Sequence, residues 1–214
     1  MGTRPNLIKI TQFSRWFAQQ PHIEHKLLHT GQHFDYNMND VFFEELGIQK
    51  PDVFLNINQG SQINVIARIM EEFEKFILEY KPDLVMVPGD VNSSFACAFV
   101  AQRYGIPVAH IESGLRSFDM TMPEEANRIL IDNLTSLYFV TEPSGTKHLL
   151  GEGKSEENIK YTGNTMIDAL VAFTPVIDAS TVREKLGVKD YYLLTFHRPV
   201  NVDNKENLTV LVDI

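Results

Sequence analysis

Cysteine, basic charge and long apolar runs are all scarce in this sequence, and each shortage excludes a class of protein. Its 214 residues include a single cysteine, Cys97, so an internal disulfide and a cysteine-rich metal site are both impossible. Lys and Arg number 19 against 28 Asp and Glu, and the net charge of −9 opposes binding to nucleic acid or to an anionic membrane. No apolar run reaches the roughly 18 residues of a membrane-spanning helix, and no signal-peptide pattern begins the sequence. We therefore expect a cytoplasmic protein.

The remaining composition is that of an ordinary globular protein, with 43% hydrophobic residues. Short apolar runs alternate with amphipathic stretches, which predicts the α/β class with a Rossmann-like, doubly wound parallel sheet. The clearest helix spans residues 62–80, and Phe13, Trp16 and Phe17 recur at helical spacing, so we expect them in the core. The predicted strands are 23–29, 53–57, 84–88, 108–112, 137–141, 159–162 and 191–196.

Both ends of the sequence look incomplete for a doubly wound protein. Gly2 to Pro5 resemble a turn between a strand and a helix, so we expect a first strand that the sequence lacks. At the other end, the pattern after residue 190 resembles the opening of a second domain. We predict an N-terminal domain over residues 1–172, and a linker with the incomplete start of a second Rossmann-like domain over residues 173–214.

The segment from Gly2 to Lys9 has the features of a phosphate site. Pro5 favours a helix N-terminus, whose free backbone N–H groups and dipole attract an anion. Arg4 can add a forked contact, and Lys9 adds a point charge one turn later. Many glycine turns before helices look the same, so a purely structural interpretation stays open.

Acidic residues follow two neighbouring predicted strands and begin the next helix. Asp90 comes directly after one strand, Glu112 ends the next, and Glu124 opens the helix that follows. Open α/β sheets bind ligands at the carboxyl ends of their strands, and spaced acidic groups there suit general acid–base catalysis. These three residues are therefore our catalytic candidates.

Structural roles compete with this interpretation. Helix capping would explain Asp90 equally well. Glu124 and Glu125 could be first-turn acids that Arg116 and Arg128 neutralise, which fits Glu125 better than Glu124.

Other turns supply candidates for binding. Asn164 follows a Gly turn, and Gln32 and His33 end another strand, where they would line the cleft or a regulatory pocket. His197 and Arg198 follow the last predicted strand, where a cationic pair would hold a leaving diphosphate. Neither a complete phosphate-binding P-loop nor a dinucleotide fingerprint is present, and the histidines near residue 25 would face both sides of a strand. We expect no cofactor and no metal.

Seven segments together resemble one family, the non-hydrolysing UDP-N-acetylglucosamine 2-epimerases. In order they are GTRPNLIK, HTGQH, PGDVNSS, HIESGLRS, MPEEANR, TGNTMIDAL and TFHRPVN. The resemblance implies a glycosyltransferase-B type fold with two Rossmann-like domains, of which the second is truncated here. It also implies interconversion of UDP-N-acetylglucosamine and UDP-N-acetylmannosamine for surface polysaccharide synthesis, and a homodimer.

The family's chemistry gives these residues roles. The C2 proton of the sugar is too weakly acidic for simple removal, so the family is understood to eliminate UDP, form a 2-acetamidoglucal and add UDP back. By position, Asp90, Glu112 and Glu124 resemble the acid–base carboxylates, and His197 resembles a catalytic nucleotide contact. Arg4 and Lys9 resemble phosphate ligands, and Gln32, His33, Arg116, Asn164 and Arg198 are further candidates for substrate binding. Which carboxylate removes the proton stays open.

One departure from the family concerns Asn6, where many members have Glu, so a charge near the phosphate turn is absent. Two competing functions also stay open. One is a glycosyltransferase-B type transferase or a hydrolysing epimerase, and the other is an inactive fragment that only binds a UDP-sugar.

Overall fold

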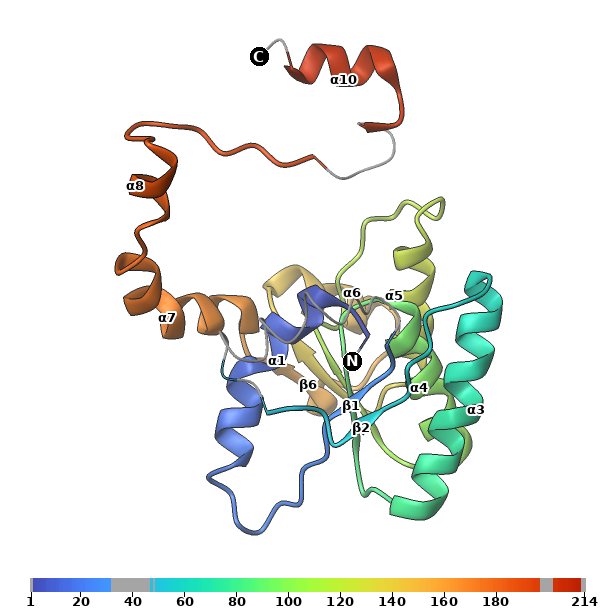
Figure 1. The fold of residues 1–214 in the computed structure, drawn as a ribbon. Helices are drawn as coiled ribbons and strands as arrows, with labels where there is room; N and C mark the ends of the chain where they lie inside the picture. Colours follow the sequence, from blue (N-terminus) through green and yellow to red (C-terminus); the bar gives the residue numbers. More distant parts are fainter. Residues whose placement is uncertain (1, 32–46, 48, 197–201, 213–214) are drawn as a thin grey trace. The chain divides into compact units, whose positions relative to one another are not determined.

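The computed structural model describes residues 2–31, 47, 49–196 and 202–212. The chain forms two compact units, Met1–Ala172 and Phe173–Ile214. In the first unit, strands and helices alternate along the chain (Figure 1). The assignment of the second unit to a further Rossmann-like domain stays a prediction.

All strand pairs of the first unit are parallel, as the α/β class requires. β1 (Leu28–His29) pairs with β2 (Val53–Phe54), and a separate four-stranded sheet has the order β3-β4-β5-β6. Its members are β3 (Val85–Pro88), β4 (Val108–Ile111), β5 (Leu137–Val140) and β6 (Ile159–Tyr161). Six of the seven predicted strands are therefore confirmed. Each is shorter than predicted, because the apolar pattern continues beyond the residues that pair with a neighbour.

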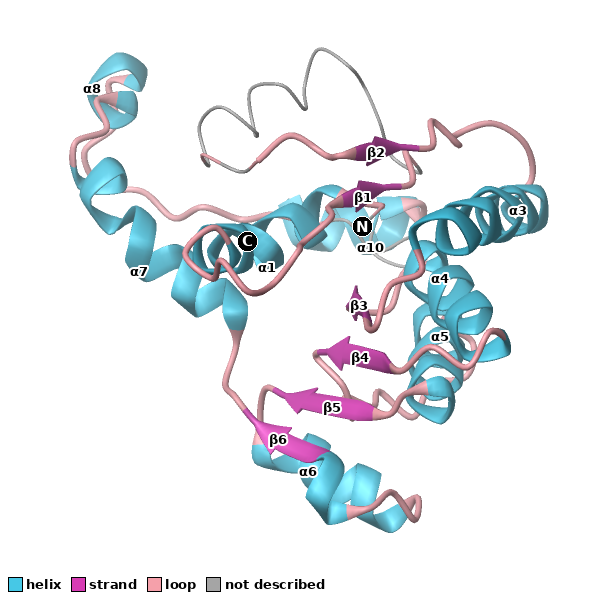
Figure 2. Cartoon of the chain, turned by 90° about the horizontal axis from the view of Figure 1, so that it is seen from below, coloured by secondary structure: helices cyan, strands magenta, loops and turns pink. Residues whose placement is uncertain are grey.

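Helices cover both sides of these strands (Figure 2). α3 (Gln62–Tyr80), α4 (Asn92–Arg103) and α5 (Pro123–Leu134) lie on one side, and α1 (Arg4–Phe17) lies on the other. The remaining helices of the first unit are α6 (Pro143–Gly151), the 3-10 helix η1 (Glu156–Asn158) and most of α7, which is Thr165–Asp178 and continues into the second unit. The second unit also contains α8 (Val182–Leu186) and α10 (Lys205–Val212).

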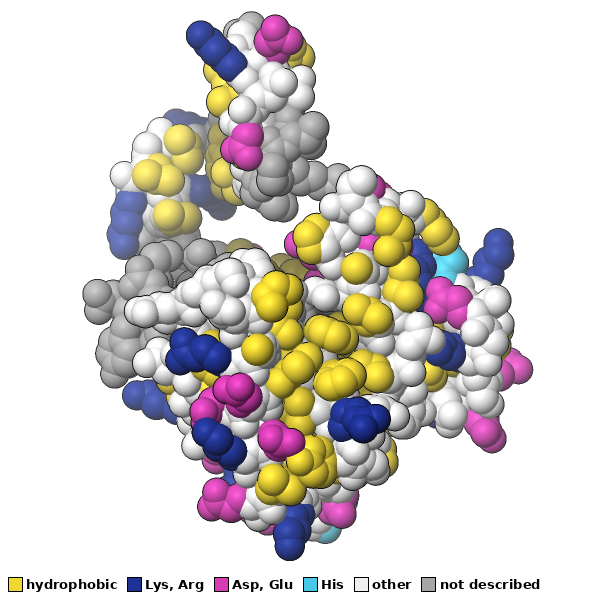
Figure 3. Space-filling view, turned by 90° about the vertical axis from the view of Figure 1, so that its right-hand side faces the viewer, with side chains coloured by type: hydrophobic (Ala, Val, Ile, Leu, Met, Phe, Trp, Pro, Cys, Tyr) yellow, Lys and Arg dark blue, Asp and Glu magenta, His cyan; other side chains and the backbone are white. Residues whose placement is uncertain are grey.

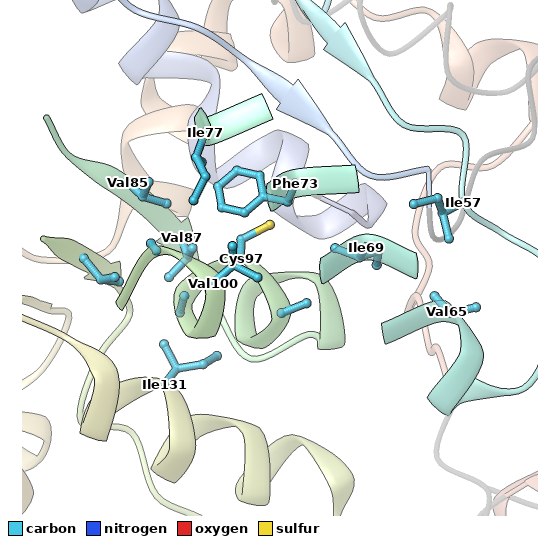
Figure 4. Close-up of a cluster of buried hydrophobic side chains, with 14 residues drawn as sticks. Ile57, Val65, Ile69, Phe73, Ile77, Val85, Val87, Cys97, Val100 and Ile131 are labelled. Carbon is cyan, nitrogen blue, oxygen red and sulfur yellow. The ribbon is translucent and has the colours of Figure 1, made fainter. Parts of the chain in front are cut away.

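The core lies between α3, α4 and the start of the four-stranded sheet (Figure 4). The predicted helix at residues 62–80 is confirmed, and its buried side chains recur every four residues, as one face of a helix requires. Burial of each large apolar side chain stabilises the fold by about 1.5–3 kcal/mol. The labelled members of this core are Ile57, Val65, Ile69, Phe73, Ile77, Val85, Val87, Cys97, Val100 and Ile131.

A cavity of about 590 Å³ lies between β1 and β3. Leu28 of β1, Met86 of β3 and Phe13 of α1 are among its lining residues. No strand pairing joins β1 to β3 within the described residues, which is why the strands form two sheets. The expectation of a first strand ahead of Gly2, which the sequence lacks, stays a prediction.

The structure corrects two expectations. Residues 191–196 form no strand, and Tyr192 is 99% exposed, because an extended apolar segment becomes a strand only when a neighbour pairs with it. Trp16 is 51% exposed and does not belong to the core, although its spacing on α1 is helical. The second unit, described by itself, leaves many apolar side chains exposed.

Candidate active site

The loops after β3 and β4 lie side by side. Their strands pair in parallel, with Pro88 opposite Ile111, so both chains leave the sheet at the same edge. The pairing continues one residue further, where the backbone N–H of Gly89 donates to the carbonyl oxygen of Ile111 at 2.9 Å. Asp90 and Glu112 are the next residues of the two loops. The predicted position at the carboxyl edge is therefore correct for both carboxylates.

Lys9 joins α1 to this edge. Its ammonium group forms an ion pair with the Glu112 carboxylate, and the two side chains are only 11% and 12% exposed. Glu112 has a φ of +69°, in the left-handed region that a residue with a side chain occupies at a cost of about 1–3 kcal/mol. The surrounding contacts therefore hold Glu112 in a conformation that its own backbone disfavours.

Gly89 lets the β3 loop come close to that ion pair. Its φ is +62°, and a Cβ atom at this position would lie 2.9 Å from Lys9 Nζ and 3.5 Å from Glu112 Oε2. Asn6 lies on the same side, and its amide Nδ2 donates to the carbonyl oxygen of Pro88 at 3.2 Å. A glutamate at position 6 would have no hydrogen to donate there when ionised.

Asp90 has a cation of its own. Arg128 Nη2 lies 2.6 Å from Asp90 Oδ2, and Arg128 Nη1 donates to Glu125 at 2.9 Å. Burial lowers the pKa of Arg128, but the hydrogen bond to Glu125 and the charge of Asp90 outweigh it and raise that pKa overall. The N-cap of α4 is Val91, so Asp90 does not cap this helix.

Glu124 and Glu125 differ sharply although they are adjacent in the first turn of α5. Glu125 is 1% exposed and accepts backbone hydrogen bonds from Ser117 and Phe118, both at 3.0 Å. Burial raises its pKa, but these bonds and the one from Arg128 lower it overall, which agrees with a structural role. Glu124 is exposed, and within the described residues no hydrogen bond or ion pair links it to the other two catalytic candidates.

Two of the candidates for substrate binding have structural partners. Arg116 is 2% exposed at its side chain, and it contacts Asp132 at 2.7 Å and both oxygens of Glu152. Asn164 accepts a hydrogen bond from the backbone N–H of Met166 at 2.9 Å, which caps α7. Contact of either side chain with a substrate stays a prediction. The side chain of Arg4, and all of Gln32, His33, His197 and Arg198, lie outside the described residues.

The N-terminus of α1 is suited to an anion. Pro5 occupies its first turn, as predicted, and no side chain caps the helix. Thr3 Oγ1 is buried without a hydrogen-bond partner among the described residues. Free N–H groups and the helix dipole together favour a bound phosphate, and Lys9 adds a positive charge nearby. The described ranges hold no group of three or more acidic, histidine or cysteine side chains that could bind a metal.

Sequence reasoning missed the side chains that support these loops. Asn127 Nδ2 donates to the carbonyl oxygen of Asp90 at 2.9 Å, and Ser94 Oγ donates to that of Pro88 at 2.6 Å. Each pair is far apart in sequence or involves a backbone carbonyl, so spacing alone gives no signal.

A parallel α/β unit with acidic side chains and a lysine at the carboxyl ends of adjacent strands defines a Rossmann-like ligand-binding domain. A family model described as UDP-N-acetylglucosamine 2-epimerase matches residues 15–214. The chain belongs to this family. None of the helices in the described residues combines the length and apolar composition needed to cross a bilayer.

Relatives and solved structures agree with that assignment. A UDP-N-acetylglucosamine 2-epimerase of Methanococcus maripaludis is 41% identical over 99% of the chain, and a UDP-2,3-diacetamido-2,3-dideoxy-D-glucuronate 2-epimerase of Pseudomonas aeruginosa is 39% identical over 100%. The crystal structure of the Methanocaldococcus jannaschii UDP-GlcNAc 2-epimerase with UDP-GlcNAc and UDP matches with a TM-score of 0.90 and 42% identity. That match covers 99% of this chain and 59% of the other. The chain spans 58% and 60% of the lengths of the two relatives.

Proposed function

We propose that the chain carries the catalytic carboxylates of a UDP-N-acetylglucosamine 2-epimerase, which interconverts UDP-N-acetylglucosamine and UDP-N-acetylmannosamine. One observation carries the proposal. Asp90 and Glu112, at the ends of adjacent parallel strands, each hold an ion pair with a different cation at one edge of the sheet. The family assignment and the UDP-GlcNAc complex of a similar structure support the choice of substrate.

The reaction needs a base, an acid and a place for the leaving group. A carboxylate removes the proton from C2, the bond from C1 to the diphosphate oxygen breaks, and UDP departs from a 2-acetamidoglucal. UDP then returns to C1 while a proton reaches C2 from the opposite face, so nothing is gained or lost overall. Two carboxylates near one anion site meet these needs. Which of them acts as base stays open.

Lys9 and the α1 N-terminus are the proposed stabilisers of the diphosphate. Lys9 neutralises Glu112 in the described structure, and its ammonium group can be shared with a diphosphate as negative charge builds up on it. The complete proposed set is Asp90, Glu112, Glu124 and His197 for catalysis, with Arg4, Lys9, Gln32, His33, Arg116, Asn164 and Arg198 for substrate binding.

We also propose a homodimer that works in the cytoplasm in surface polysaccharide synthesis. An apolar face on α3, α4 and α5 supports the dimer (Figure 3). Among the exposed apolar side chains of these three helices are Ile63 at 73%, Phe99 at 38% and Leu130 at 46%. Large exposed apolar patches on soluble proteins commonly mark interfaces. Sedimentation measurements test this, because a Phe99→Glu variant should shift a dimer to monomer.

Deuterium exchange tests the activity. The chain is incubated with UDP-N-acetylglucosamine in deuterium oxide, and NMR follows the label at C2 and the appearance of the manno epimer. Label in both epimers supports the proposal. Release of UDP with free sugar would instead show a hydrolysing enzyme, and binding by calorimetry without label or release would contradict catalysis. UDP-2,3-diacetamido-2,3-dideoxy-D-glucuronate is the second substrate to compare, because one relative is named for it.

A further inference from the structure

His110 lies behind the candidate site and has two partners that both accept hydrogen bonds. Its side chain is 1% exposed in the middle of β4. Nδ1 lies 2.7 Å from Asp132 Oδ1, and Nε2 lies 3.0 Å from the carbonyl oxygen of Gly89. A backbone carbonyl has no hydrogen to give. A neutral imidazole carries one N–H, so it can satisfy only one of two such acceptors.

Asp132 must therefore supply or accept the remaining proton, and its other contacts decide which. Its second oxygen accepts the backbone N–H of Gly114 at 3.0 Å and lies 2.7 Å from Arg116 Nη1. Asp132 thus stays ionised and acts as an acceptor on both oxygens.

We propose that His110 is a buried, doubly protonated imidazolium that fixes the Gly89 carbonyl and so positions Asp90. With both ring nitrogens donating, neither acceptor is left facing a lone pair. The geometry alone carries this assignment, and it holds whether or not the chain turns over a UDP-sugar. His110 is a positioning residue, because it acts on Asp90 through the Gly89 carbonyl.

The charges around His110 favour this protonation state. Asp132 faces it from α5, and Arg116 lies on the far side of Asp132 and pairs with Glu152. A protonated His110 has its counter-charge in direct contact, on Asp132 Oδ1. Tyr138 of β5, the neighbour of His110 in the sheet, donates its hydroxyl to backbone carbonyls and not to the ring.

The loop that His110 holds is anchored at three successive carbonyl groups. Ser94 and Asn6 donate to Pro88, His110 to Gly89, and Asn127 to Asp90. These donors leave the Asp90 carboxylate free to pair with Arg128 while its backbone is held. Fixing a reacting group in this way is worth a large factor in rate, because small misplacements slow a reaction steeply.

His29 provides an internal contrast. It ends β1 and is 1% exposed, but its Nδ1 accepts a hydrogen bond from the backbone N–H of Gly31 at 2.9 Å. This contact requires an unprotonated Nδ1. Burial lowers the pKa of His29 to about 3. The two buried histidines should therefore differ in charge at the same pH.

Long-range ¹H–¹⁵N correlation spectra of the ¹⁵N-labelled chain test the proposal. At about pH 8, where free histidine with its ordinary pKa of about 6.5 is neutral, His110 should show two nearly equal, protonated ring-nitrogen shifts. His29 should show the widely separated pair of a neutral ring. A neutral pattern for His110 would overturn the proposal without bearing on the epimerase activity. The variants His110→Gln and His29→Gln assign the signals.

A second experiment tests whether His110 positions Gly89 and Asp90. In the His110→Gln variant, the amide signals of Gly89 and Asp90 should shift, whereas His148→Gln, which removes a ring contact with the Gly114 carbonyl, should leave them in place. The amide signals do not depend on the proposed function, but the rate measurement rests on it. For the epimerase reaction, kcat should fall by about 10- to 100-fold with KM nearly unchanged. Unmoved Gly89 and Asp90 signals would contradict the positioning role. If His110→Gln does not fold, the wild-type spectrum still decides the charge.

Discussion

Two charged clusters lie next to each other in the first unit, and they differ in how many hydrogen-bond donors their carboxylates already contact. In the outer cluster, Asp90 is 25% exposed at its side chain and pairs with Arg128, and Glu112 pairs with Lys9. In the inner cluster, Asp132 is fully buried and its two oxygens meet three donors. A carboxylate with one partner keeps lone pairs for a substrate, whereas a saturated one can only support its surroundings. The number of donors around a carboxylate therefore distinguishes a side chain that can react with a substrate from one that supports the fold. The charge of the side chain does not make this distinction.

The largest expected effect comes from the outer cluster. Glu112→Gln removes the proposed acid or base and should slow deuterium exchange at C2 by about 10²- to 10⁴-fold. The chain should still fold, because the amide can accept a hydrogen bond from Lys9. Glu79→Gln, at an exposed position of α3, is the matched control and should exchange at the normal rate. A normal exchange rate in Glu112→Gln would show that Glu112 is not the acid or the base.

The inner cluster should dominate stability instead. Asp132→Asn removes the anion of the buried His110 and one of the two anions of Arg116, and should lower the free energy of unfolding by about 3–5 kcal/mol. Asp168→Asn, which changes an exposed carboxylate of α7, should alter it by less than about 0.5 kcal/mol. Urea unfolding followed by circular dichroism measures both. Equal stability of the two variants would show that the inner cluster does not support the fold.

Gly89 tests how tightly the loop is held against the outer cluster. Gly89→Ala combines a positive φ with a contact at 2.9 Å from Lys9 Nζ, and should cost about 2–3 kcal/mol of unfolding free energy. Gly105→Ala has a similar φ of +69° but open space around the new methyl group, and should cost about 1 kcal/mol. The difference between the two variants isolates the contact. If both cost the same, the loop has room to move away from Lys9.

The smallest effect is a pH dependence at the boundary between the clusters. The pKa of Glu125 is lowered in the folded state, so its contribution is present above its unfolded pKa of about 4.3 and is lost as the pH falls through the lower folded value. Between about pH 6 and pH 3, the stability difference between wild type and Glu125→Gln should therefore shrink. A difference that stays constant over this range would contradict the prediction for Glu125.

Features that depend only on neighbouring residues in the sequence could be predicted. The helix at residues 62–80 and six strands follow from periodicity, and Asp90, Glu112 and Lys9 follow from their positions beside turns. The segment 191–196 failed because an apolar extended stretch carries no information about whether a neighbour pairs with it. The predicted strands are longer than the observed ones for the same reason.

The support of the site could not be predicted, because it depends on distant partners. His110 and Asp132 lie 22 positions apart, and Asn6 reaches Pro88 across 82 positions. No spacing rule links such residues before the fold is known. His110 stood inside a motif that the sequence singled out, yet its charge follows only from seeing that both neighbours accept hydrogen bonds.

The backbone of Glu112 implies a trade-off that selection has to maintain. Residues such as Asn or Gly tolerate its left-handed conformation better, so either one at position 112 would relieve local strain and lose the carboxylate. Selection for folding alone would therefore replace the glutamate at this position. A glutamate in a strained backbone therefore indicates a demand other than stability.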